Sequence, residues 1–204
     1  MKPVAQLISI IFHPLLLTTY LVTVLGLFFP SMLMIDPSKL RVMVAFVFVF
    51  TFLMPVINLV MLRTFGTIGS LKLESRGERI LPFIMIAVIY AVITFLFYYK
   101  LSFSHNFNKF MFIILMLVLA SLAFTLFFKI SVHSLAMWGG VGILLPLNKA
   151  MEEPTLLLPT VVLILIAGLV MSARLLLNAH TIREVMYGSM VGFLIGFGGI
   201  IVLF

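Results

Sequence analysis

The chain alternates between long apolar stretches and short polar ones, and this alternation is its strongest structural signal. A helix needs about 20 mainly apolar residues to cross a bilayer. Stretches that meet or approach this length lie at roughly 4–29, 40–62, 81–99, 109–128, 132–148, 155–173 and 183–204. The fifth is short and contains glycines and Pro146, so the pattern predicts six or seven spans. Unbroken apolar runs are typical of helices and not of barrel strands. We therefore predict an all-α, polytopic transmembrane helix bundle that forms a single membrane domain over residues 1–204.

The composition supports a membrane protein. Of the 204 residues, 64% are hydrophobic and 9% are charged, and the mean hydropathy is +1.33. Soluble proteins carry about 25% charged residues. The first apolar stretch is too long for the core of a signal peptide, so we expect a retained span. These features predict an integral membrane protein, and we expect it in a bacterial inner (plasma) membrane.

The net charge of +7 and the absence of cysteine limit the kinds of partner and of reactive site that we expect for this chain. In a soluble protein such a charge would suggest nucleic acid. Here we expect no nucleic-acid partner, because cytoplasmic loops, lipid headgroups or an anionic substrate explain the charge better. Without cysteine, the chain has no disulfides, thiolate metal sites or cysteine nucleophiles.

Three polar segments concentrate most of the candidate chemistry. They are "RTFGTIGSLKLESRGER" (63–79), "KISVHS" (129–134) and "SARLLLNAHTIRE" (172–184). Two apolar stretches separate the first segment from the second, and two more separate the second from the third. With seven spans, all three segments reach the same face of the membrane and could build one site.

The third segment contains an acid, an imidazole and a cation. His180 and Glu184 are four residues apart, which places them on one face of a helix. A carboxylate there can hold the imidazole Nδ1–H and leave Nε2 free as a nucleophile or base. Arg174 precedes them and suits two phosphate oxygens. The simpler alternative is a histidine at the membrane interface bonded to a nearby glutamate, while the arginines extend to lipid headgroups.

The second segment places Ser131 and His133 at the start of an apolar stretch. The free N–H groups of a helix start favour an anion. Ser131 could cap this helix and contact a phosphate oxygen, and His133 could donate a proton to a leaving group. The alternative is an ordinary serine cap beside a histidine at the water boundary.

The first segment places Lys72 and Arg79 seven residues apart, so two helical turns would bring them onto one face. Both are candidate phosphate ligands. The alternative for this segment is a solvated loop that follows the positive-inside rule.

Taken together, the three segments resemble the type-2 phosphatidic acid phosphatase superfamily of membrane histidine phosphatases. The family pattern is Lys-x6-Arg-Pro, then Pro-Ser-Gly-His, then Ser-Arg-x5-His-x3-Asp. This chain matches the spacing over residues 72–184. Its departures are Ile80 for proline, Ile130 and Val132 around Ser131, Ala173 before Arg174, and Glu184 for aspartate.

The resemblance implies a metal-independent lipid phosphatase that works through a phosphohistidine. His180 would be the nucleophile, Glu184 would orient it, and His133 would protonate the leaving oxygen. The implied phosphate ligands are Lys72, Arg79, Ser131 and Arg174. The expected substrate is a phosphorylated lipid in the bilayer, of the polyprenyl pyrophosphate, phosphatidylglycerol phosphate or phosphatidic acid class.

Several alternatives stay open. A non-catalytic anionic-lipid-binding protein or a small transporter would carry similar charges, and a lipid phosphotransferase would use the same histidine. His13, next to Pro14 in the first span, suits a proton relay, but we favour a helix–helix hydrogen bond to Asn58, Thr18 or Thr19 beside a proline kink. The chain has one aspartate and five glutamates, too few at close spacing for a magnesium site, so no metal and no cofactor is predicted.

Overall fold

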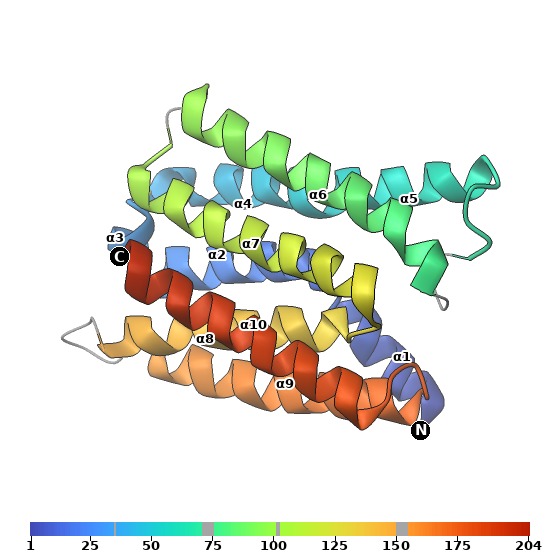
Figure 1. The fold of residues 1–204 in the computed structure, drawn as a ribbon. Helices are drawn as coiled ribbons and strands as arrows, with labels where there is room; N and C mark the ends of the chain where they lie inside the picture. The colour runs from blue at the N-terminus through green and yellow to red at the C-terminus, as the bar shows by residue number, and fades with distance from the viewer. Residues whose placement is uncertain (35, 71–75, 101–102, 150–154) are drawn as a thin grey trace.

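The computed structural model describes residues 1–34, 36–70, 76–100, 103–149 and 155–204, and helix is the only regular structure in these ranges (Figure 1). The α-helices are α1 (Lys2–Ile11), α2 (Leu17–Phe28), α3 (Pro30–Leu33), α4 (Leu40–Phe48), α5 (Met54–Thr64), α6 (Arg76–Tyr99), α7 (His105–Phe127), α8 (Val132–Lys149), α9 (Leu157–Leu176) and α10 (Ile182–Leu203). Short 3-10 turns cover Pro14–Leu16 and Pro37–Lys39, and a π-helical segment covers Val49–Leu53. The predicted all-α polytopic bundle is confirmed.

Six helical segments of the described chain are long and apolar enough to cross a membrane. They are Lys2–Phe28, Pro37–Thr64, Gly77–Tyr99, His105–Phe127, Leu157–Leu176 and Ile182–Leu203. The helix α8 follows α7 in the sequence and is shorter and less apolar than these six segments. It nevertheless runs the length of the bundle (Figure 1). It needs fewer lipid-facing apolar residues because its neighbours bury most of it. With α8 added to the six candidate spans, the described residues pass along the bundle seven times.

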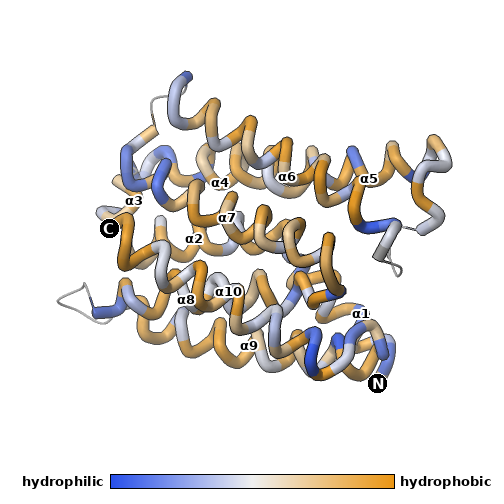
Figure 2. The backbone as a smooth tube through the Cα atoms, in the orientation of Figure 1, coloured by the Kyte–Doolittle hydropathy of each residue, from blue (hydrophilic) through white to orange (hydrophobic). Residues whose placement is uncertain are grey.

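This alternation brings the three polar segments to one end. The N-terminus, the end of α5 and the start of α6 lie at the right of Figure 1, and so do the α7–α8 and α9–α10 connections. Figure 2 shows a mainly hydrophobic chain between more hydrophilic ends. The predicted common face of the three segments is confirmed for the described part of the chain.

The first span is broken rather than continuous. The helix α1 ends at Ile11, His13 is extended (φ −65°, ψ 139°), and a 3-10 turn from Pro14 leads into α2. Proline disfavours helical geometry in the residue before it and donates no N–H. The sequence therefore dictates a break at His13 inside the predicted span over 4–29, which the structure retains as one candidate span, Lys2–Phe28.

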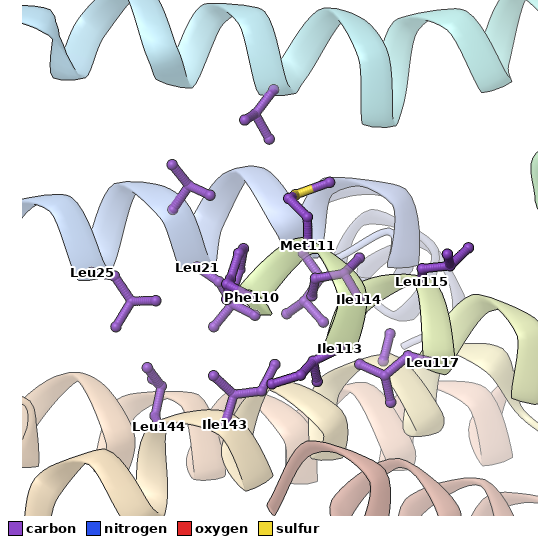
Figure 3. Close-up of a cluster of buried hydrophobic side chains, with 14 of the residues drawn as sticks. Leu21, Leu25, Phe110, Met111, Ile113, Ile114, Leu115, Leu117, Ile143 and Leu144 are labelled. Atoms are coloured by element: carbon purple, nitrogen blue, oxygen red, sulfur yellow. The ribbon is translucent and has the colours of Figure 1, made fainter. Parts of the chain in front are cut away.

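The bundle is held together by an interior apolar cluster and a close contact between two helices. Leu21, Leu25, Phe110 and Ile143 are among the buried side chains that pack between α2, α7 and α8 (Figure 3). Three glycines of α10 approach the backbone at the start and along the length of α8. A Cβ added at Gly188 would lie 2.6 Å from the Ser131 carbonyl oxygen. At Gly192 and Gly196, an added Cβ would overlap the carbonyl oxygens of Leu135 and Gly139.

Candidate active site

A cavity of about 170 Å³ lies inside the bundle at the end where the polar segments meet. Its polar lining consists mainly of three imidazoles and two guanidinium groups, from His13, Arg79, His133, Arg174 and His180. These residues come from the break between α1 and α2, the first turn of α6, the start of α8, the last turn of α9 and the α9–α10 turn. Segments that are far apart in the sequence thus contribute to one cavity.

His180 and Glu184 form the hydrogen bond that their spacing predicted. The distance between His180 Nδ1 and Glu184 Oε2 is 2.6 Å, and His180 is only 8% exposed. A carboxylate oxygen accepts, so Nδ1 carries the proton of the neutral ring. The Nε2 atom is then the unprotonated nitrogen, and His180 belongs to the residues that line the cavity.

The local geometry of this pair differs from the prediction of two residues on one helix. His180 precedes α10, and Thr181 is the N-cap, whose hydroxyl accepts from the Glu184 backbone N–H at 3.3 Å. Glu184 therefore occupies the third position of the helix, where a capping box places an acid that points back towards the chain entering the helix. The Thr-x-x-Glu signature in the sequence could have revealed this arrangement.

The surroundings of His180 favour its neutral form. Burial lowers its pKa from 6.5 to about 4, the hydrogen bond to Glu184 opposes this, and the charges of Arg79 and Arg174 lower it further. A neutral imidazole with a bare Nε2 is the form that acts as a nucleophile. At pH 7 the histidine is therefore in the state that such chemistry requires.

We expect the ring to titrate near pH 4 and to stay neutral, with the proton on Nδ1, from pH 5 to 8. Nitrogen NMR of histidine-labelled protein in detergent micelles would report both the protonation and the tautomer of His180. The His180→Ala variant identifies the signal. A midpoint near 6.5, or a proton on Nε2 at pH 7, would contradict this description.

Two arginines supply positive charge to the same cavity. Arg79 is 6% exposed, and its Nη1 donates to the Ile130 carbonyl oxygen at 3.4 Å. Arg174 Nε is buried and has no hydrogen-bond partner among the described residues. The two guanidinium groups also repel each other. An anion bound between them would relieve this repulsion and accept the free donor.

Ser131 caps α8 as predicted, but its side chain is not part of the cavity wall. It is fully buried, and its Oγ accepts from the Ser134 backbone N–H at 3.3 Å and pairs with the Ser134 hydroxyl at 2.9 Å. Ser131 Oγ accepts in both of these hydrogen bonds, and the contact of its hydroxyl with a phosphate oxygen stays a prediction. Its backbone N–H donates to the Glu184 carbonyl oxygen at 3.1 Å, which joins α8 to α10 beside the site.

His133 lines the cavity, and its ring is fixed by a contact with the first span. The distance between its Nε2 and the Ser9 carbonyl oxygen is 3.1 Å. Since a carbonyl only accepts, Nε2 carries the proton, and Nδ1 is the bare nitrogen of the neutral ring. Any proton that His133 gives to a substrate must therefore come from Nδ1 after a second protonation.

The sequence did not predict that His13 lines the cavity, and one predicted phosphate ligand lies outside the described residues. Lys72 lies outside the described residues, so its role at the site stays a prediction. His13 was assigned a bond to another helix, to Asn58, Thr18 or Thr19. Instead, its Nδ1 accepts from the Leu15 backbone N–H at 3.3 Å, and its ring lines the cavity.

The apolar part of the lining also follows a pattern that the sequence contains. Phe83, Ile86 and Tyr90 follow Arg79 at helical spacing along α6, and all four line the cavity. An apolar stripe thus continues from a cation towards the bundle interior. The cavity is suited to a ligand with an anionic group and an apolar portion.

Comparisons with known proteins add no relative. No family model, no curated protein and no solved structure matches this chain. Among the described residues, no three histidine, aspartate or glutamate side chains come together as a metal site would require. The geometry of the cavity and the spacing of its residues are therefore the observations that point to a function.

Proposed function

We propose that this chain is a membrane phosphatase that hydrolyses a lipid phosphate or pyrophosphate through a phosphohistidine on His180. The observation that carries the proposal is the bare Nε2 of a histidine oriented by Glu184, in the same cavity as Arg79 and Arg174. A nucleophile, its orienting acid and two cations are the groups that phosphoryl transfer requires. The spacing that resembles the type-2 phosphatidic acid phosphatase superfamily supports the same assignment.

The first half of the reaction forms the phosphoenzyme. The lone pair of His180 Nε2 attacks phosphorus while the bond to the leaving oxygen breaks. Glu184 stabilises the positive charge that develops on the ring. Arg79 and Arg174 hold the phosphoryl oxygens and stabilise the charge of the transition state. His133, which is neutral in the free protein, takes up a second proton on Nδ1 from water before the chemical step and gives that proton to the leaving lipid oxygen.

The second half of the reaction releases phosphate. Water attacks phosphorus, His133 Nδ1 takes the proton of the water, and the bond between phosphorus and His180 breaks. The hydrogen bond from His133 Nε2 to the Ser9 carbonyl persists in both protonation states of the ring, so it keeps Nδ1 in place. His180 is then neutral with a bare Nε2, and His133 is again protonated on Nδ1, as at the start of the chemical step.

A lipid suits this site better than a soluble phosphate ester. Helices that suit a bilayer surround the cavity, and Phe83, Ile86 and Leu117 line it beyond the charged groups. An apolar lining with a few convergent polar groups is typical of ligand sites. We expect the phosphate to bind at the arginines and the adjoining apolar part of the lipid to contact this lining.

The test is phosphate release by purified protein in detergent. The substrates are a polyprenyl pyrophosphate, phosphatidylglycerol phosphate and phosphatidic acid, and glycerol phosphate serves as the soluble control. We expect release from at least one lipid, little from the control, and no loss of rate in chelator, because arginines supply the charge that a metal would otherwise supply. Folded protein that releases phosphate from none of the lipids would contradict the proposal.

Arg174→Ala should lower the rate of phosphate release by about 10²- to 10³-fold, the cost of removing one transition-state donor. Because the Nε of this arginine is buried and has no hydrogen-bond partner among the described residues, the loss of rate reports on its contact with the bound anion. Arg183→Ala is the matched control, because Arg183 is exposed and lies in the first turn of the next helix, α10. Equal rates for the two variants would remove Arg174 from the site.

A further inference from the structure

His13 is placed in the cavity by the break in the first span. Proline at position 14 keeps His13 extended, and the helix α1 has already ended at Ile11. His13 then caps the following turn, because its Nδ1 accepts from the Leu15 backbone N–H at 3.3 Å. An accepting Nδ1 is unprotonated, so the proton of the neutral ring is on Nε2.

The break also explains how His13 and His133 come together. In an uninterrupted helix the Ser9 carbonyl would accept from the N–H of residue 13. The break leaves this carbonyl without that donor, and His133 Nε2 bonds to it at 3.1 Å. The rings of His13 and His133 then lie edge to face, with centroids 5.6 Å apart. One feature of the chain therefore positions two imidazoles of the cavity.

These contacts give the three histidines different roles. The neutral ring of His180 has a bare Nε2, and His133 uses its only N–H on the Ser9 carbonyl. His13 Nε2–H makes no hydrogen bond within the described part of the chain, although its ring lines the cavity. Among the three neutral imidazoles, His13 is thus the one with an N–H left for a ligand.

We infer that His13 is a third histidine of the site, which binds the phosphoryl group by donating a hydrogen bond from neutral Nε2–H to one of its oxygens. The inference rests on the proposed function for the identity of the anion. His13 keeps its proton throughout, because losing it would leave an imidazolate. It is therefore a binding residue that adds to Arg79 and Arg174, and the proton transfers remain with His133.

Two substitutions separate this role from the capping role. The amide oxygen of His13→Asn can accept from the Leu15 N–H as Nδ1 does, but the side chain is too short to replace the Nε2 donor. His13→Gln places an amide N–H2 near the position of Nε2 and is a poor cap. Binding of inorganic phosphate, measured by calorimetry in detergent, is the first readout, and phosphate release from the best lipid is the second.

We expect His13→Asn to weaken phosphate binding by about 10- to 100-fold, as for a lost hydrogen bond to a charged group, and to unfold at nearly the wild-type temperature. His13→Gln should bind phosphate more tightly than His13→Asn despite lower thermal stability. His105→Ala, an exposed histidine at the other end of the bundle, should match wild type.

The opposite order of affinities would overturn the inference, because a residue that only caps is replaced better by asparagine. Wild-type protein that binds no phosphate would overturn it too. The proposed function has a separate test. If the protein binds phosphate with the expected order of variants but hydrolyses no lipid, the anion site at His13 stands and the proposed phosphatase activity is wrong.

Discussion

His180→Ala is expected to abolish phosphate release, with a loss on the order of 10⁴-fold or more. The other groups of the cavity would still bind the lipid phosphate, but none replaces a buried imidazole whose Nε2 is held bare by Glu184. Binding of inorganic phosphate should change far less than the rate. The measurement is release from the best lipid substrate, beside phosphate binding by calorimetry.

The matched control is His105→Ala, which removes an exposed histidine at the far end of the bundle. Thermal unfolding in detergent shows whether either variant is misfolded. A folded His180→Ala protein that keeps a tenth or more of the wild-type rate would exclude His180 as the nucleophile and would favour a binding or transport role for the cavity.

Gly192→Ala is expected to destabilise the bundle by about 1–3 kcal/mol or more. A Cβ at this position would overlap the carbonyl oxygen of Leu135, which is rigid helix backbone of α8. To accommodate the methyl group, α10 must move away from α8. These helices begin at the site, where the Ser131 N–H donates to the Glu184 carbonyl, so phosphate release should fall as well.

Gly198→Ala on the same helix is the control, because an added Cβ there meets nothing within 4 Å. Its effect on stability should be near zero or slightly favourable, since alanine has the higher helix propensity. Thermal unfolding in one detergent compares the two variants. Equal unfolding temperatures would mean that α8 and α10 are not in backbone contact.

Much of the fold was predictable because a bilayer imposes length and apolarity on each span. The start of α7 was predicted too late, at 109, and is observed at His105. Ser104 accepts from the Phe107 N–H at 3.1 Å, so a capped polar turn precedes the apolar run. Apolarity alone does not detect helical turns that lie at the membrane surface.

Those parts of the site were predictable in which the spacing of residues along the chain determines which side chains come together. His180 and Glu184 were expected to pair and do so, and the alternation of spans brought Arg79, His133 and His180 to one cavity. The orientation of individual side chains was not predictable. Ser131 bonds to Ser134 instead of facing the cavity.

The contact between His133 and Ser9 was also beyond prediction, since it joins residues 124 positions apart and depends on how the first span packs against α8. Pro14 signalled a kink in that span. It did not reveal which carbonyl would lose its donor in α1 or which side chain would replace that donor. Such contacts follow from tertiary packing and leave no local pattern in the sequence.

The most direct test of the account is a search for phosphate on His180 itself. Protein is mixed with a lipid substrate labelled in its phosphorus, quenched in alkaline denaturant, digested and analysed by mass spectrometry. We expect an acid-labile, alkali-stable phosphoryl group on the peptide that contains His180, and no label in His180→Ala. Rapid phosphate release with no phosphoenzyme at any time, or with label on another residue, would exclude a phosphohistidine on His180.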